Sequence, residues 1–301
     1  MKQRILACLT ILLFMACCSS NDRDNLQQLK AEIQAKVGTF PEATVAVVYK
    51  NLASNEILAI NEKEMMHAAS TMKVPVMIEV FKQAEEDRFN LDDSVVVKNE
   101  FKSIMDGSLY AMDIGEDSDE SIYDQINKKM TIRDLTNQMI TVSSNLATNL
   151  LIERVGVQNV TKTMQEIGAH DIQVLRGVED LKAYRAGKNN VTDAHDLMLV
   201  MAAIAQKQVV TAQACEQMIE ILRHQKFNDK IPALLPASVK VAHKTGSITK
   251  IDHDFGIVYP RNYPPYILVV LTKGIADKKQ AENLISEISK LIYDYHSNSP
   301  T

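Results

Sequence analysis

The fold is decided near the carboxyl end of the chain, where residues 239–273 read VKVAHKTGSITKIDHDFGIVYPRNYPPYILVVLTK. Three runs rich in β-branched and aromatic residues, 239–243, 255–259 and 266–272, predict strands. The segment 260–265 between the last two contains three prolines and predicts a turn. Strands joined by such short connections form antiparallel sheets.

The amino-terminal part of the chain supplies more of the same layer. Residues 44–49 and 56–60 are short β-branched runs separated by a polar stretch, as in a hairpin. Residues 25–37 carry apolar side chains at helical spacing, and a second helix is predicted at about 277–295. Both ends of the chain therefore contribute strands and a flanking helix.

The middle of the chain, about 70–225, is dominated by helical spacing. The predicted fold class is α/β (α+β): an antiparallel β-sheet flanked by terminal helices, with an inserted all-helical lobe. The folded body spans 25–301, with its sheet part at about 25–66 and 226–296. Ligand sites favour junctions of this kind, so we expect a cleft between sheet and lobe.

The first residues predict export. Lys2 and Arg4 precede an apolar run that is too short to cross a bilayer, and a small residue precedes Cys17. This pattern resembles a bacterial lipoprotein signal. The resemblance implies that 1–16 is a signal peptide, that Cys17 is lipidated, and that 17–24 is a tether holding the protein in the periplasm or cell envelope. The alternative is a plain signal peptide with an incidental cysteine pair.

Composition excludes several functions. The 301 residues carry a net charge of -5 without a basic block, so no nucleic-acid partner is expected. Only Cys215 of the four cysteines lies in the folded body, which excludes a disulfide framework and favours a small core residue. His243 and His253 lack metal-ligand spacing, so we expect them in solvated loops and expect no metal and no cofactor. We expect a monomer whose only membrane contact is its lipid anchor.

Candidate chemistry begins at 68–75, AASTMKVP. The spacing of Ser70 and Lys73 places both on one face of a helix that begins at Ser70. A hydroxyl needs a neighbouring base to act as a nucleophile, and a desolvated lysine can serve. Taken alone, Ser70 could equally be a helix N-cap.

Two further elements follow in order. Ser143 and Asn145, in TVSSNLA at 141–147, place a hydroxyl and an amide two residues apart. His243 is then followed by Lys244, Thr245, Gly246 and Ser247, which supply a fixed positive charge, a hydroxyl donor and room for close backbone approach.

Together these elements resemble the three signatures of the class A β-lactamase and penicillin-binding protein superfamily. The resemblance implies acylation by a β-lactam or a D-Ala-D-Ala peptide. It also implies the following roles: Ser70 as nucleophile, Lys73 as base or proton relay, Ser143 as proton donor, Asn145 as substrate and lysine ligand, Lys244 and Thr245 as carboxylate binders, and the Ser70 and Ser247 amides as the oxyanion hole.

The sequence departs from that superfamily in one loop. Class A enzymes carry a glutamate that activates the deacylating water, followed four residues later by an asparagine. Here Glu179 is the candidate, but position 183 is alanine. Glu179 is therefore either the general base or a surface carboxylate. Ser144 replaces the usual acidic middle residue of the second element. The acidic run 115–121 is expected to be an exposed loop, with a position at the border of the cleft as the alternative.

Three functions remain open from the sequence. The first is a serine β-lactamase that acylates at Ser70 and deacylates through Glu179. The second is a peptidase or esterase of the same superfamily acting on cell-wall peptides or small esters. The third is a lipid-anchored binding protein that acylates and then stalls.

Overall fold

The computed structural model describes residues 20–298 and contains a five-stranded antiparallel sheet in the order β2-β1-β11-β10-β9. The signal peptide and Cys17 predicted from the sequence lie outside the described residues. The strands are β1 (Thr44–Asn51), β2 (Ile57–Ile60), β9 (Lys240–Ile248), β10 (Ile251–Tyr259) and β11 (Tyr266–Lys273). Both ends of the chain contribute strands, so the predicted antiparallel sheet is confirmed.

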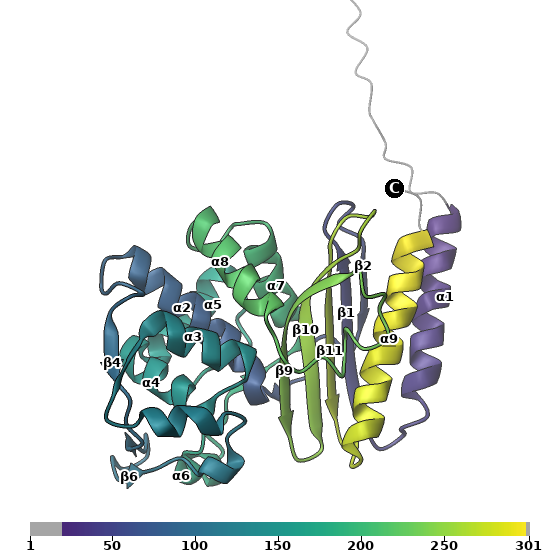
Figure 1. Ribbon diagram of the computed structural model, residues 1–301. Coiled ribbons are helices and arrows are strands. Elements are labelled where there is room, and N and C mark those ends of the chain that lie inside the picture. Colours follow the sequence, from purple (N-terminus) through teal and green to yellow (C-terminus); the bar gives the residue numbers. More distant parts are fainter. Residues whose placement is uncertain (1–19, 299–301) are drawn as a thin grey trace, which may run out of the picture.

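Helices cover both faces of the sheet (Figure 1). The terminal helices α1 (Ser20–Val37) and α9 (Lys278–Asn298) lie side by side on one face. On the other, α7 (Ala194–Ala205) contacts β1, β10 and β11, while α8 (Ala212–Arg223) contacts β9. These two helices were predicted as part of the lobe. α7 is apolar almost all round, and a helix of this kind requires burial on both sides, which explains why it lies against the sheet.

The strands are buried on both faces. In β1, the side chains of Val45, Val47 and Tyr49 pack toward α1 and α9, while Ala46 and Val48 pack toward the lobe. Because successive strand residues point to opposite faces, a continuous apolar run is what a doubly covered strand requires. The sheet therefore separates two hydrophobic cores.

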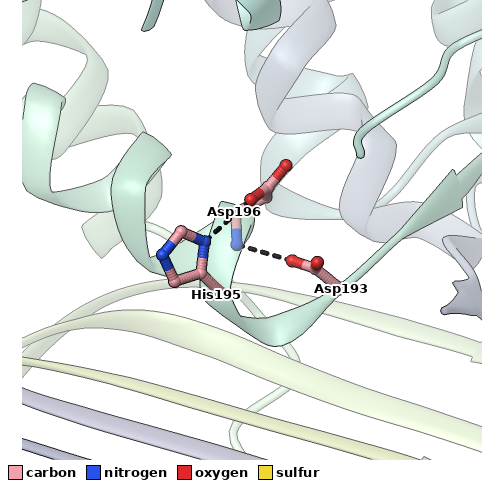
Figure 2. Close-up of side chains that lie close together, drawn as sticks. All are labelled: Asp193, His195 and Asp196. Carbon is pink, nitrogen blue, oxygen red and sulfur yellow. Dashed lines mark hydrogen bonds and ion pairs between the residues drawn. The ribbon is translucent and has the colours of Figure 1, made fainter. Parts of the chain in front are cut away.

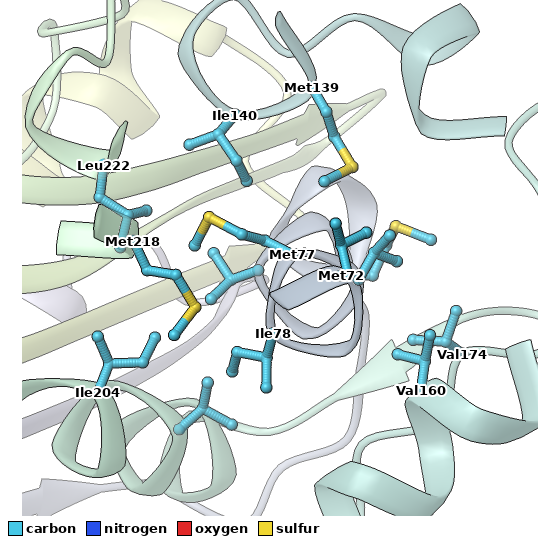
Figure 3. Packing of buried hydrophobic residues seen from close by; sticks show 14 of the residues in the cluster. Met72, Met77, Ile78, Met139, Ile140, Val160, Val174, Ile204, Met218 and Leu222 are labelled. Atoms are coloured by element: carbon cyan, nitrogen blue, oxygen red, sulfur yellow. The ribbon is translucent and has the colours of Figure 1, made fainter. Parts of the chain in front are cut away.

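The lobe is built around α2 (Lys73–Glu85), which follows a single 3₁₀ turn, η1 (Ala69–Met72). Met77 and Ile78 of α2 lie among side chains from several other helices, including Met139, Val160 and Met218 (Figure 3). The remaining lobe helices are α3 (Ile132–Thr141), α4 (Asn145–Val155), α5 (Val157–Ile167) and α6 (Leu181–Arg185). The lobe also contains the 3₁₀ turns η2 (Ile114–Glu116) and η3 (Glu120–Gln125). Burial of α2 fixes the segment that carries the first motif.

The lobe is not entirely helical, contrary to the sequence prediction. It contains three short antiparallel pairs: β3 (Met66–His67) with β8 (Val191–Thr192), β4 (Ser94–Val96) with β7 (Lys129–Thr131), and β5 (Phe101–Lys102) with β6 (Leu109–Tyr110). Strands of two or three residues are too short to show an alternating pattern in a sequence.

The first helix is also longer than predicted. α1 begins at Ser20, so residues 20–24, predicted to be tether, are helical in the structure. This stretch contains neither glycine nor proline to stop the helix from extending beyond its packed part. Among the described residues, no helix is long and apolar enough to cross a membrane.

Candidate active site

The first motif lies at the junction of sheet and lobe. Ser70 sits in η1 rather than in the α-helix predicted to start there, and α2 begins three residues later at Lys73. The turn is closed by Thr71, whose backbone N–H and hydroxyl both donate to the Ala68 carbonyl at 3.0 and 2.6 Å. Pro75 falls in the first turn of α2, where its missing N–H removes no helical hydrogen bond.

Lys73 is completely buried, and its ammonium is held by oxygens of the second motif. Nζ donates to the Ser143 carbonyl at 2.7 Å, to the Ser143 hydroxyl at 3.2 Å and to Asn145 Oδ1 at 2.8 Å. Burial lowers the pKa of Lys73 to about 7, while the carboxylates of Asp117 and Glu179 oppose that shift. A lysine with this pKa can accept a proton at neutral pH.

The acidic run 115–121 is not simply an exposed loop, because Asp117 is buried beneath the second motif. Its carboxylate accepts hydrogen bonds from the backbone N–H groups of Asn145 and Leu146, each at 2.8 Å. Ser144 caps the same helix, α4, by accepting from Ala147 N at 3.2 Å. The carboxylate missing at position 144 is therefore supplied to the start of α4 by Asp117, which the sequence analysis missed.

The third motif lies inside β9 rather than after it. Lys244 is buried, and its Nζ donates to the Ser143 hydroxyl at 3.0 Å and to the Thr245 carbonyl at 2.8 Å. A Cβ added at Gly246 would lie 3.1 Å from the backbone nitrogens of both Ser70 and Thr71, so glycine lets the strand approach the first motif. Ser143 is thus contacted by both Lys73 and Lys244.

His243 and His253 were predicted in solvated loops, which is wrong. Both are buried in strands of the sheet, and each ring has a polar partner. His243 Nδ1 lies 2.9 Å from the carboxylate of Asp254, and His253 Nε2 lies 3.0 Å from the His67 carbonyl. Polar residues can be buried in strands when such partners satisfy them, and sequence alone does not reveal those partners.

Lys230 is a second residue missed by the sequence analysis. It is buried, and its Nζ donates to the Ser247 hydroxyl at 2.8 Å and forms an ion pair with Asp252 at 3.0 Å. Ser247 in turn donates to Asp252 at 2.7 Å. No spacing pattern connects Lys230 to the third motif, because the contact forms only when the segment before β9 folds back.

Glu179 lies on a loop that faces the same cleft. Its carboxylate accepts from Asp113 N at 2.9 Å and lies 3.5 Å from Asn145 Nδ2. Burial, followed by the Asp117 charge, raises the pKa of Glu179 above its usual value. The Asn149 side chain pins the preceding residue, Val178, through both its backbone N–H and its carbonyl, at 2.7 and 2.9 Å.

Position 183, four residues after Glu179, offers no polar side chain. Ala183 is buried, and its N–H donates to Asp180 Oδ1 at 3.1 Å, which caps α6. Arg176 closes the other side of the loop by donating to the carbonyls of Lys188 and Gly177, each at 3.0 Å. Glu179 is therefore fixed by its loop without help from position 183.

The motif residues meet at two cavities that share Ser70 and Ser247. The larger cavity, about 640 Å³, is lined by Ser70, Asn145, Glu179, Tyr184 and Ser247, among others. The smaller, about 250 Å³, is lined by Ser70, Ser143, Lys230, Thr245 and Ser247, among others. Lys73 and Lys244 reach this cleft through their bonds to Ser143. The structure thus brings the three motifs and Glu179 together around one hydroxyl.

One group of described side chains has the arrangement of a possible cation site: Asp193, His195 and Asp196, at the start of α7 (Figure 2). The ammonium of Lys63 already lies 3.3 Å from Asp193 and 3.0 Å from Asp196. Asp193 also caps α7 by accepting from Asp196 N at 2.7 Å. A lysine cation that neutralises these carboxylates and a helix cap account for the cluster, so we assign it a structural role.

Comparison with known proteins agrees with this geometry. A model of the beta-lactamase enzyme family matches residues 28–296. The chain belongs to this family. Family and fold together support a serine hydrolase of the β-lactamase and penicillin-binding type.

Individual relatives are distant. A beta-lactamase of Bacillus amyloliquefaciens is 24% identical over 93% of this chain and 85% of its own length. An imipenem-hydrolyzing beta-lactamase of Enterobacter cloacae is 22% identical over 96% and 94%. Among solved structures, PBP-A superposes with a TM-score of 0.78 at 25% identity, covering 91% of this chain and 97% of PBP-A. The TLA-3 extended-spectrum beta-lactamase has the same TM-score at 20% identity over 90% and 98%, which shows the shared fold.

The lowered pKa of Lys73 predicts a pH dependence of stability. Lysine in the unfolded chain keeps its ordinary pKa near 10.5, whereas in the fold it is about 7. Between these values the unfolded state binds more protons at this residue, so its contribution to the free energy of unfolding rises with pH. Relative to Lys73→Met, the wild type should gain at most about 1.4 kcal/mol per pH unit from pH 7 to 9.

Urea unfolding of both proteins at pH 7, 8 and 9 measures this gain. Lys102→Met, at an exposed position, is the control and should not alter the pH trend. A difference between wild type and Lys73→Met that stays constant over this range would contradict a lowered lysine pKa.

Proposed function

We propose that this protein is a serine β-lactamase of the class A type that hydrolyses the β-lactam amide through an acyl-enzyme on Ser70. The observation that carries the proposal is the buried ammonium of Lys73, which lies 3.2 Å from the Ser143 hydroxyl beside the cleft that Ser70 lines. In its neutral form Lys73 takes the Ser70 proton as the hydroxyl attacks the carbonyl. The Ser143 hydroxyl then delivers its proton to the leaving nitrogen and takes the proton held by Lys73 in exchange, which leaves Lys73 neutral again.

Substrate orientation follows from the two parts of the cleft. Thr245 and Lys230 line the smaller cavity, and Lys244 lies behind it, so the substrate carboxylate binds there. The acyl side chain then occupies the larger cavity beside Glu179. The backbone N–H groups of Ser70 and Ser247 are the proposed oxyanion hole.

Deacylation requires a base near the ester. Glu179 lines the same cavity as Ser70, and its raised pKa suits proton transfer to and from water. The buried Ala183 provides no second water ligand, so the role rests on Glu179 alone.

The second candidate is a penicillin-binding protein of the same family, which acylates and releases slowly, or a peptidase acting on D-Ala-D-Ala peptides. The similarity to PBP-A favours it, since a PBP-A variant has been solved as an acyl-enzyme complex with penicillin G. The two candidates share the acylation step and differ in the fate of the ester.

Two substitutions test the mechanism. Ser70→Ala should abolish the covalent penicillin adduct seen by mass spectrometry, because the attacking oxygen is gone. Glu179→Gln should acylate within a few-fold of wild type and release product about 10²- to 10⁴-fold more slowly, the usual contribution of a general base. Nitrocefin turnover and adduct lifetime are the measurements.

Glu85→Gln, at an exposed position at the end of α2, is the matched control and should behave as wild type. An adduct that persists on the wild type would favour the penicillin-binding candidate. Failure of the wild type both to turn over nitrocefin and to form an adduct would rule out both.

The larger cavity should discriminate against anionic acyl side chains. Its lining includes the carboxylates of Asp113, Glu116 and Glu179. The Arg176 guanidinium also lines it, so the carboxylates outnumber the one guanidinium in their part of the cavity. We expect α-carboxybenzylpenicillin to have a several-fold lower kcat/KM than benzylpenicillin at low salt. Glu116→Gln or added salt should narrow that ratio, because the repulsion is between exposed charges. A ratio of the two kcat/KM values near one would contradict this expectation. So would a ratio that stays the same in Glu116→Gln and in added salt.

We also propose that the protein is lipid-anchored in the cell envelope through Cys17, as its amino-terminal sequence indicates. Metabolic labelling with an alkyne-tagged fatty acid should mark the wild-type protein and the Cys18→Ala variant, but not Cys17→Ala. Equal labelling of all three proteins, or of none, would contradict the assignment.

A further inference from the structure

The residue before the proposed nucleophile has an unfavourable backbone conformation. Ala69 has φ of 46°, in the left-handed region that costs a non-glycine residue about 1–2 kcal/mol. Its position determines where the hydroxyl and the backbone N–H of Ser70 point. Surrounding contacts must therefore hold Ala69 in place if Ser70 is the nucleophile, and the inference below rests on that proposed function.

The contact that does so comes from His67. Its ring nitrogen Nδ1 accepts a hydrogen bond from the Ala69 N–H at 3.0 Å. An acceptor role requires a neutral ring with its proton on Nε2. Burial, together with the nearby Arg176 charge, lowers the pKa of His67 to about 4, so the ring is neutral at physiological pH.

His67 is itself fixed by the sheet. The buried His253 of β10 lies opposite Gly246 of β9, and its Nε2 donates to the His67 carbonyl at 3.0 Å. Its Nδ1 lies 3.2 Å from Thr272 N and 2.9 Å from the Asp252 carbonyl, so both ring nitrogens have backbone partners. A chain of hydrogen bonds thus runs from the central strands to the residue next to Ser70.

The His67 imidazole also contacts the segment that carries Glu179. The His67 ring meets the Tyr184 ring edge-on, with 6.2 Å between the ring centroids. The Arg176 guanidinium lies 5.6 Å from the centroid of the Tyr184 ring. His67 therefore touches both the turn that holds Ser70 and the loop that holds Glu179.

We propose that His67 is a positioning residue, which holds Ser70 in its reactive orientation through the Ala69 N–H and is itself fixed by His253. It acts through the backbone N–H of Ala69, and its ring also lines the larger cavity.

Two variants separate the hydrogen bond from the ring contact. His67→Phe keeps an aromatic ring against Tyr184 but has no acceptor. His67→Asn loses the ring, but its side-chain oxygen can accept from the N–H two residues on, as in an Asx-turn. We expect the benzylpenicillin acylation rate constant to fall about tenfold in His67→Phe, the loss that one hydrogen bond of ~1.4 kcal/mol represents.

The acylation rate constant of His67→Asn should stay within about threefold of wild type. Wild-type acylation by His67→Phe, or equal impairment of both variants, would overturn the proposal. The rates are measured well below each variant's thermal midpoint, so that unfolding does not contribute.

Two measurements on the resting protein decide the proposal even if penicillin does not react with it. Nitrogen NMR of the wild type at pH 7 should show His67 as the neutral tautomer protonated on Nε2. Hydrogen exchange should show a protected Ala69 amide in wild type and His67→Asn, and a faster one in His67→Phe. A charged or Nδ1-protonated ring, or unprotected Ala69 in wild type, would overturn the positioning role, whereas absence of acylation alone would overturn only the proposed function.

Discussion

Burial of the Lys73 ammonium between α2 and the turn before α4 is the constraint on which the cleft depends. A fully buried ammonium is costly unless its donors are satisfied. Three oxygens from Ser143 and Asn145 satisfy them, and this requirement brings the second motif onto the first. The same desolvation lowers the lysine pKa toward neutrality. One interaction thus closes the lobe around the first motif and prepares a base.

A second buried cation connects the lobe to the sheet. Lys244 reaches from β9 to the Ser143 hydroxyl, and Gly246 lets the strand lie against the turn that holds Ser70. Two buried ammonium groups near one hydroxyl disfavour each other's charge, since the positive charge of Lys73 lowers the pKa of Lys244 beyond the effect of burial. Ser143 is therefore placed to donate its proton away from both lysines and toward the cleft.

The departures from the class A pattern have structural substitutes. Asp117 provides from a distant loop the carboxylate that position 144 lacks, and it also faces Lys73. Ala183 cannot hold a water, yet the loop around Glu179 is fixed by Asn149 and by Arg176. A family pattern can thus lose individual side chains while the groups around the cleft remain supported.

The sequence by itself determined the strand runs of the sheet and the residues of the three motifs. Periodicity and close spacing are local properties of the chain, so they can be recognised without knowing the tertiary structure. It did not reveal that α7 and α8 cover the sheet, or that His253, Asp117 and Lys230 are buried beside the motifs. Each of these depends on a partner far along the chain: His253 contacts a carbonyl 186 residues earlier, and Asp117 an amide 28 residues later. Only tertiary structure decides such contacts, since whether a polar side chain is solvated or buried depends on what the fold places against it.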